Sequence, residues 1–207
     1  AFIAHNYNTP GDAGAFEAEA NDILSQVEAE CGWLYETKHT DGRTARINYT
    51  VWSDVYLCPE CTSEVVFWDA AVDRSAAEVK DEFPCPHCSA NLSKRNMERA
   101  WVTSVDPDSQ STERQPKRVP VLINYTIGGK RFEKKPDDAD RRLIEKIEST
   151  PVPYWVPTEN VIDGKEIGRL RSIGVTRVHQ IVPKRANWVL GAYLSKCKNP
   201  RLKLAVT

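Results

Sequence analysis

The chain has 207 residues, of which 41% are hydrophobic and 28% charged, so it is long enough to bury a core in one large or two small domains. No apolar run approaches the roughly 18 residues that a membrane helix needs, and the N-terminus lacks the residue order of a signal peptide. These features predict a cytoplasmic protein with no membrane partner.

The formal net charge of −1 conceals two halves of opposite sign. Residues 1–90 carry 16 acidic and 5 basic side chains, whereas residues 91–207 carry 13 acidic and 23 basic ones. The positive excess of the second half predicts an anionic partner, although a solvated surface has the same composition.

The first predicted element is an amphipathic helix within residues 9–34. Apolar side chains recur at helical spacing along one face: Phe16, Ala20, Ile23, Leu24, Val27 and Cys31. Thr9, Pro10 and Asp12 supply a helix start signal. The apolar face predicts that this helix packs against another part of the protein.

Residues 45–57 are rich in β-branched and aromatic side chains, and we expect one long strand or a hairpin that leads into the first cysteine pair. After the second pair, residues 97–105 predict a strand, 106–115 a polar turn and 118–127 the returning strand. A Gly-Gly turn then leads into residues 130–135. The tetrapeptide INYT occurs at Ile47 and at Ile123, which is a weak repeat.

The C-terminal part predicts two helices separated by loops. Residues 137–150 form the first helix, capped by Asp137 or Asp138, and a proline-rich turn follows at 151–158. Residues 163–177 contain three glycines and four basic side chains with little periodicity, so we expect a mobile loop there. Residues 185–197 again have a helical pattern.

The strongest chemical signal is the pair of motifs CPEC and CPHC, with 23 residues between them. Each CxxC turn can place two thiolates on one Zn²⁺, and two such turns complete a tetrahedral shell. Strand-like residues before and between the motifs fit a zinc ribbon, in which hairpins carry the cysteines at their tips. We therefore predict one structural zinc ion bound by Cys58, Cys61, Cys85 and Cys88. Four ordinary buried cysteines and a redox-active pair are the alternatives.

A catalytic zinc site is not predicted. The second motif contains half of the zinc-deaminase signature, but none of the four histidines is followed two residues later by glutamate. Four cysteine ligands leave no open position for water, so His87 is expected to be a turn side chain or at most a substitute ligand. Cys31 and Cys197 lie far from both motifs, and we expect both to be buried apolar residues.

Together these elements predict an α+β fold, with an antiparallel β-rich domain that carries a four-cysteine zinc ribbon and is flanked by helices at both ends. We expect a helical segment at residues 1–44, the β domain at 45–135 with the zinc ribbon at 57–92, and a basic helix and loop segment at 136–207.

Seven segments in order carry a further signal: FIAHNYNTP, CGWLYETKHTDGR, INYTVWSDVYLCPEC, VVFWDAAVD, DEFPCPHC, VPVLINYTIGGKRFEK and GVTRVHQIVPKRANWVL. Together they resemble the internal region of the adenine-specific DNA methyltransferases that contain a zinc ribbon. They cover nearly the whole chain, and as an ordered set they are more specific than the cysteines alone.

The resemblance implies an excised insert between the cofactor half and the catalytic half of such an enzyme. In that family a glycine-rich S-adenosylmethionine motif precedes the matched region and a catalytic DPP[YF] turn follows it, and this chain contains neither motif. The resemblance thus implies target recognition on duplex DNA, with S-adenosylmethionine bound only by the remainder of the parent methyltransferase. The chain alone is expected to be inactive. Residues 136–207 are expected to connect the insert back to the core domain of the parent enzyme.

The basic half agrees with that role, because lysine and arginine side chains contact phosphates. The candidate phosphate contacts are Lys94, Arg95, Lys117, Arg118, Lys130, Arg131, Lys184 and Arg185. A loop with Arg169, Arg171 and Arg177 is expected to reach a groove edge. The aromatic side chains are more typical of a core than of base stacking: Trp52, Tyr56, Trp68, Trp101 and Trp188.

Two classes of function stay open. The first is a DNA-recognition domain of a methyltransferase, and the second is a structural or protein-interaction zinc-ribbon insert without direct DNA contact. An independent enzyme agrees less well with the sequence, because no catalytic set of residues is found.

Overall fold

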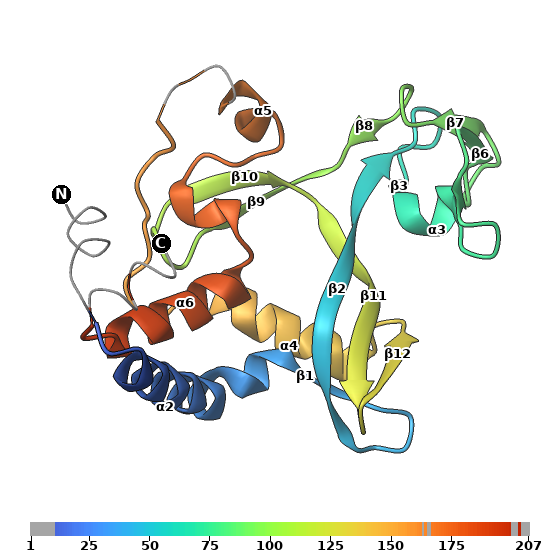
Figure 1. The fold of residues 1–207 in the computed structure, drawn as a ribbon. Helices are drawn as coiled ribbons and strands as arrows, with labels where there is room; N and C mark the ends of the chain where they lie inside the picture. The colour runs from blue at the N-terminus through green and yellow to red at the C-terminus, as the bar shows by residue number, and fades with distance from the viewer. Residues whose placement is uncertain (1–10, 163, 165–166, 200–202, 204–207) are drawn as a thin grey trace.

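The computed structural model describes residues 11–162, 164, 167–199 and 203. It is an α+β fold with antiparallel sheets and with helices at both ends of the chain, as predicted. Figure 1 shows the longer helices beside a long sheet, with smaller regions at the upper end of that sheet. None of the described helices is long and apolar enough to cross a membrane.

The N-terminal helix α2 (Ala13–Cys31) begins at Asp12, whose carboxylate accepts two backbone hydrogen bonds from the first turn. Half of the predicted apolar face is buried: Ile23, Val27 and Cys31. Leu24 is 54% exposed, so its predicted burial is wrong. The other predicted start residues, Thr9 and Pro10, lie outside the described residues.

Helix α2 packs in one layer with α4 (Asp138–Ser149) and α6 (Lys184–Lys196), which confirms both predicted C-terminal helices. Asp137 is the N-cap of α4 and forms a capping box with Asp140. Trp188 of α6 meets Trp33 of the short helix η1 (Gly32–Tyr35) edge-to-face at 5.6 Å between ring centroids. Two cysteines are buried in this core, as predicted: Cys31 and Cys197.

The main sheet has the order β1 (Glu36–Lys38), β2 (Thr44–Leu57), β11 (Arg118–Ile127) and β12 (Lys130–Lys134), and its strands are antiparallel. β2 is one strand of 14 residues, so the hairpin alternative for this segment is wrong. The predicted Gly-Gly turn joins β11 to β12, and both glycines have positive φ, at 55° and 75°.

The two INYT tetrapeptides lie side by side on β2 and β11, where Thr50 pairs with Ile123. Asn48 donates a side-chain hydrogen bond of 2.8 Å to Asn124, while Ile47 and Ile123 are both buried. The repeated residues therefore occupy similar positions on neighbouring strands of one sheet, and each strand needs an apolar residue on the buried face and a polar one on the other.

The predicted strand, turn and returning strand at residues 97–127 are wrong in their boundaries and pairing. The first strand divides at Ala100 into β8 (Glu98–Arg99) and β9 (Trp101–Val105), since the Ala100 backbone bonds to Val55 and Lys117. β9 pairs with β10 (Thr112–Pro116), whereas β11 pairs with β2 and β12. Alternation of side chains predicts a strand but does not identify its partner.

Residues 163–177, predicted as a loop, contain the short helix α5 (Ile167–Ser172), so the loop prediction is wrong for those six residues. Residues 163, 165 and 166 lie outside the described residues. After α5, Gly174 has φ of +81° and crosses the β9–β10 hairpin, where an added Cβ would lie 2.7 Å from Cδ of Pro116. Glycine allows both the positive φ and the close approach to Pro116, because it has no side chain.

We expect Gly174→Ala to lower the free energy of unfolding by about 1–3 kcal/mol, because alanine is strained at this φ and collides with Pro116. Gly168→Ala is the matched control: it lies in α5 with open space around it, and alanine favours a helix by up to about 1 kcal/mol. Chemical denaturation followed by circular dichroism measures both variants. Equal stability of the two variants contradicts the expectation.

Candidate functional site

The four motif cysteines lie in two turns that face each other within one lobe of the protein. Cys58 and Cys61 lie in the turn between β2 and β3 (Glu64–Val66). Cys85 and Cys88 lie in the turn between β6 (Glu82–Pro84) and β7 (Asn91–Ser93). Each turn is held at both ends by an antiparallel strand pair, which fixes the direction of its cysteine side chains.

The two turns have the same backbone conformation. In the first, the N–H of Thr62 donates to the carbonyl of Cys58 at 2.9 Å, and in the second, Ser89 donates to Cys85 at 3.0 Å. Thr62 and Ser89 both have positive φ, at 58° and 61°. Two equivalent turns place two sulfur atoms each toward a common centre.

The four sulfur atoms form a compact cluster in which all lie within 4.8 Å of one another. The Sγ atoms of Cys58 and Cys88 are 3.8 Å apart, and those of Cys61 and Cys85 are also 3.8 Å apart. None of the four forms a disulfide. Sulfur ligands at about 2.3 Å from a tetrahedral zinc ion lie about 3.8 Å from each other, so the cluster could hold a metal ion such as zinc.

The surroundings of the thiols favour ionisation at two positions. Hydrogen bonds from the side chain and backbone of Ser63 lower the pKa of Cys61 to about 6. Burial opposes ionisation of Cys85, but the backbone N–H groups of His87 and Cys88 hold its pKa below the ordinary value. Donors aimed at sulfur stabilise thiolates, which are the form that binds a metal ion.

Cys88 behaves differently. The backbone N–H of Ala90 favours its thiolate, but desolvation and the neighbouring thiols of Cys61 and Cys85 raise the pKa of Cys88 to about 12. Four negative charges within 4.8 Å repel one another, so without a cation one thiol keeps its proton. A divalent cation would remove this repulsion and release that proton.

The side chain of His87 points away from the sulfur cluster. Its Nε2 lies 3.2 Å from the carbonyl oxygen of Glu64 on β3, and its backbone N–H donates to Cys85 Sγ at 3.4 Å. The sequence-based expectation of a turn side chain is therefore confirmed. Within the described residues, the four cysteines are the one group of three or more potential ligands close enough to share an ion.

A small apolar core surrounds the cysteines. Phe67 meets Tyr56 and Phe83, with 5.8 Å between ring centroids in both pairs. Phe67 belongs to a short helix, α3 (Phe67–Ala71), so the strand predicted between the cysteine pairs ends at Val66. The lobe also contains two short strands, β4 (Val72–Asp73) and β5 (Glu78–Val79), which pair with each other.

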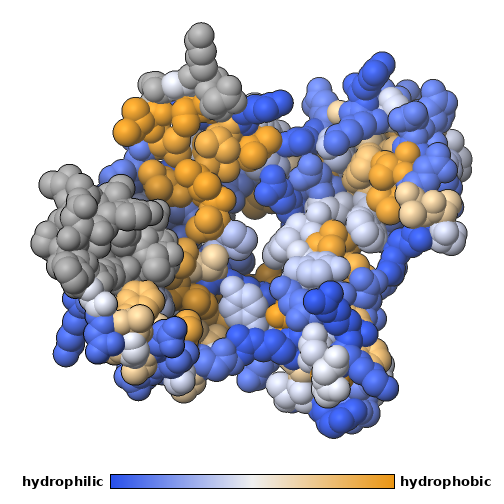
Figure 2. Space-filling model, viewed as in Figure 1, coloured by the Kyte–Doolittle hydropathy of each residue, from blue (hydrophilic) through white to orange (hydrophobic). Residues whose placement is uncertain are grey.

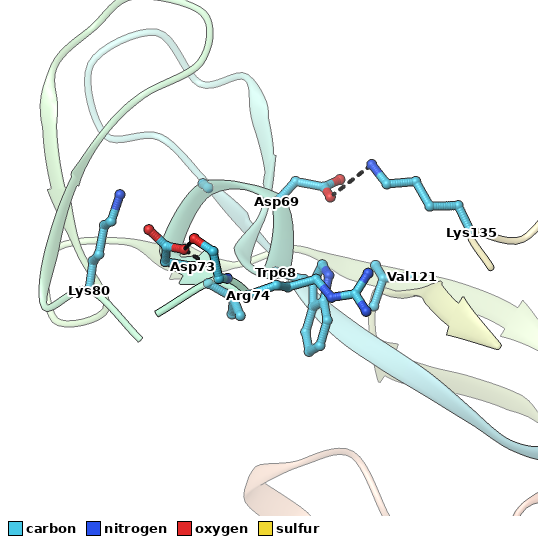
Figure 3. Close-up of a pocket in the computed structure, with 10 residues that line it drawn as sticks. Trp68, Asp69, Asp73, Arg74, Lys80, Val121 and Lys135 are labelled. Carbon is cyan, nitrogen blue, oxygen red and sulfur yellow. Dashed lines mark hydrogen bonds and ion pairs between the residues drawn. The ribbon is translucent and has the colours of Figure 1, made fainter. Parts of the chain in front are cut away.

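A shallow pocket of about 420 Å³ lies beside the lobe, between α3 and the main sheet. Figure 3 shows Asp69 facing Lys135, and these two groups are 3.8 Å apart. Arg74 pairs with Glu133, and Asp73 accepts hydrogen bonds from Ser75. Two of the cations that line the pocket, Arg74 and Lys135, are thus paired within the protein, and the charge of Lys80 acts on Asp73.

Several predicted DNA contacts are exposed. Lys94 and Arg95 lie in the turn between β7 and β8, Lys130 and Arg131 begin β12, and Arg169 lies on α5. None of these five forms an ion pair with a described carboxylate, although the ammonium group of Lys94 lies over the ring of Phe67, 5.4 Å from the ring centroid. Arg171 on α5 is also exposed. Figure 1 shows these groups in three regions of the protein: the cysteine lobe, the lower end of the sheet and α5.

The other predicted DNA contacts have partners inside the protein. Their ion pairs and ring contacts are Lys117 with Glu64 at 2.7 Å, Arg118 with Asp54 at 3.1 Å, Arg177 with Glu113 at 2.8 Å, Lys184 with Asp108 at 3.3 Å, and Arg185 over the ring of Tyr35 at 5.9 Å. Burial lowers the pKa of Arg185. These five side chains stabilise the fold, and a DNA role would require them to exchange these partners.

The aromatic residues predicted to lie in the core divide into two groups. Tyr56 and Trp188 are buried, as predicted, whereas Trp52 and Trp101 are 42% and 37% exposed. The core prediction is therefore wrong for these two tryptophans, because each lies on the open face of a strand. Trp68 is half-buried.

A network of buried ion pairs and hydrogen bonds joins the β9–β10 hairpin to the C-terminal segment, and it was not predicted from the sequence. Asp106 meets His179 at 2.7 Å, and its turn partner Asp108 meets Lys184. His179 lies in the short helix η2 (Val178–Ile181). The only sequence signal was a polar turn, which gives no information on partners some 70 residues away.

The pKa values of two carboxylates reflect this network. Burial opposes ionisation of Glu113, but hydrogen bonds from Arg177, Ser111 and Thr176 hold its pKa below the ordinary value. Asp106 is likewise buried, and its hydrogen bond with His179 keeps its pKa low. The folded protein therefore stabilises both carboxylates in their charged form.

Comparison with family models, curated proteins and solved structures finds no match to this chain.

We expect the stability of the protein to fall as the pH decreases through about 4. The folded-state pKa values of Asp106 and Glu113 are below their unfolded values of about 4, so their contribution is complete above about pH 5 and is lost on protonation. Glu113→Gln should reduce this dependence and cost about 1–2 kcal/mol at neutral pH. Glu17→Gln, on the exposed face of α2, is the control. Unfolding curves between pH 3 and 7 measure the effect, and equal pH profiles for Glu113→Gln and the wild type contradict it.

Proposed function

We propose that the four cysteines bind one structural Zn²⁺ and that residues 57–92 form a zinc ribbon. The proposal is supported by two equivalent hairpin turns, by sulfur separations of 3.8 Å, and by donors that favour thiolates. Four sulfur ligands leave no position for water or substrate, so the ion has no catalytic role.

The size of the lobe gives the reason for a metal ion. Eight buried residues form its core, and two of them are the ligands Cys58 and Cys85. A core this small contributes little stability alone. Zinc binding would supply the missing free energy, since the metal holds the β2–β3 turn against the β6–β7 turn.

We expect one Zn²⁺ per chain in the purified protein, and we expect Cys85→Ser to lose it and to lower the melting temperature. Cys31→Ser is the matched control, because Cys31 is buried in the helical core far from the cluster. That variant should lose stability and keep its zinc. Elemental analysis and thermal unfolding with and without a chelator measure these effects. A Cys85→Ser protein with normal zinc content and melting would falsify the proposal.

We further propose that the chain is the DNA-recognition part of an adenine-specific DNA methyltransferase. The observation that carries this proposal is a set of exposed cations that have no carboxylate partner among the described residues: Lys94, Arg95, Lys130, Arg131 and Arg169. They lie on turns, a strand start and a short helix, where side chains extend from the surface. Unpaired positive charge in such places is suited to phosphate contacts.

The enzyme assignment comes from the sequence resemblance alone. In the proposed parent, S-adenosylmethionine and the catalytic turn belong to regions outside this chain, and this chain positions duplex DNA so that an adenine can be extruded from the stack. The chain by itself should transfer no methyl group.

A second candidate is a structural or protein-interaction insert without DNA contact. It is favoured by exposed apolar side chains, of which Ile162 is 86%, Trp155 71% and Ile181 52% exposed. Figure 2 shows apolar side chains gathered around α5 and the segments beside it. Such a surface is typical of contact with another protein or another part of a longer chain.

The two candidates predict different results for duplex binding. We expect the chain to bind duplex DNA at low salt and to lose affinity steeply as salt increases. Charge reversal at Lys94 and Arg95, or at Lys130 and Arg131, should weaken binding about equally across sequences and reduce the salt slope by about 0.9 per lost contact. Fluorescence anisotropy with labelled duplexes measures both quantities.

Charge reversal at Arg141 and Arg142 is the control for net charge, since both lie exposed on α4 and neither is a predicted contact. Reversal at Lys117 or Arg118 is less informative, because it also breaks the ion pairs with Glu64 and Asp54. Absence of duplex binding at low salt excludes the DNA role and leaves the insert without DNA contact as the function.

A further inference from the structure

The β9–β10 hairpin, residues 101–116, has one largely exposed face, which Gly174 approaches at Pro116. Cross-strand pairs place Thr103 opposite Arg114 and Trp101 opposite Pro116, so these side chains share a face. All five residues of β9 are exposed, and Val105 is 62% exposed. Arg114 and Thr103 therefore point to the surface from a two-stranded ribbon.

On the opposite face, Glu113 of β10 is held against the C-terminal segment, whereas Val102 and Ser104 of β9 are exposed. Glu113 accepts hydrogen bonds from Thr176 and Arg177, at 2.9 and 2.8 Å. Gly174 contacts the backbone of the same strand beside Pro116. The turn of the hairpin is fixed as well, by Asp106 with His179. The ribbon is thus rigid although it has no apolar core of its own.

These contacts also decide the charge of the open face. Residues 101–116 contain three carboxylates, and the side chains of Asp106, Asp108 and Glu113 are only 11%, 4% and 10% exposed. Asp108 and Glu113 pair with Lys184 and Arg177, and Asp106 is hydrogen-bonded to the ring of His179. Arg114 is the one basic residue of the hairpin, and it is exposed. The outer surface of the ribbon is therefore positive and rich in hydrogen-bonding groups, with its negative charge buried.

Arg114 is held in place by its neighbour. Its guanidinium lies over the ring of Trp101, 4.8 Å from the ring centroid, an interaction that orients the group without neutralising it. A guanidinium held in this way loses little freedom when it forms two parallel hydrogen bonds to a guanine edge. The exposed hydroxyl of Thr103, directly across the ribbon, can donate to or accept from a base.

Part of the proposed phosphate contacts lies near the ribbon. Figure 1 shows α5, which carries Arg169, above the hairpin, and the β7–β8 turn of the cysteine lobe, which carries Lys94 and Arg95, farther along the chain beyond β8. A cation beside the ribbon can contact the phosphates that border a groove. The major groove is about 12 Å wide and admits a two-stranded β ribbon.

We propose that the open face of the β9–β10 hairpin enters the major groove of duplex DNA and that Arg114 and Thr103 contact base edges there. This inference rests on the proposed DNA function, and it specifies which element determines sequence preference. Lys94, Arg95 and Arg169 contact phosphates and contribute affinity without sequence preference.

The test uses the complete chain and a pool of duplexes randomised over the central base pairs. Repeated selection with the wild-type protein yields a preferred sequence, and affinity is then measured for that duplex and for unselected ones. Arg114→Gln and Thr103→Val should each weaken binding to the selected duplex, about tenfold or more for Arg114→Gln. Affinity for unselected duplexes should change little.

Arg43→Gln is the matched control, because Arg43 lies 66% exposed in the β1–β2 turn at the opposite end of the sheet. It should leave both affinities unchanged. Each variant must retain the melting temperature of the wild type, which keeps a folding defect distinct from a lost contact. Val replaces Thr103 without a change in shape, so only the hydroxyl is removed.

The possible results separate this inference from the proposed function. If the wild type binds no duplex, the proposed DNA function fails, and the inference fails with it. If the wild type binds and Lys94 and Arg95 reversal weakens it, but selection yields no preferred sequence or Arg114→Gln keeps the preference, the ribbon inference alone is overturned. Tighter binding to single strands than to duplex also overturns it, since stacking on Trp101 would then explain binding.

Discussion

The constraint on which the rest of the structure depends is the length and register of β2. This single strand of 14 residues pairs with β1 at its start, with β11 along most of its length, and with β3 and β8 at its end. It therefore belongs to both the main sheet and the cysteine lobe, and it ends at Leu57, directly before Cys58. A shift of one residue would move Ile47 and Val55 from the core to the surface. The position of the first cysteine turn is thus fixed by packing at the other end of the sheet.

Two kinds of interaction then hold the smaller regions to this sheet. The cysteine lobe has a small apolar core and depends on the sulfur cluster, whereas the β9–β10 hairpin depends on buried charges. Buried ion pairs contribute little net stability, because desolvation offsets much of their attraction, but losing one partner is costly. Their effect here is on conformation: Asp106 and Glu113 can be buried only when His179 and Arg177 lie against the hairpin.

Local features were predictable from the sequence, and long-range pairing was not. The caps at Asp12 and Asp137, the Gly-Gly turn and the cysteine spacing each depend on a few neighbouring residues, and the structure agrees with them. The division of the strand at Ala100 depends on β2 and Lys117, which are distant in sequence. The exposure of Trp52 and Trp101 likewise depends on which strand faces are covered, and composition does not contain that information.

The opposite charges of the two halves are a second case in which composition did not predict which residues pair, and this case bears on function. Carboxylates of the acidic half pair with cations of the basic half in several places, for example Glu64 with Lys117 and Asp54 with both Arg99 and Arg118. Part of the positive excess therefore stabilises contacts between the halves and does not face a partner. The predicted phosphate contacts that remain exposed, at turns, at the start of β12 and on α5, are few and lie in separate regions. A duplex bound by so few phosphate contacts is held weakly, so discrimination between sequences must come from a rigid element with directed donors. Among the described exposed arginines of the hairpin and its neighbours, Arg114 is oriented by an aromatic ring on a fixed ribbon, which suits it to that task.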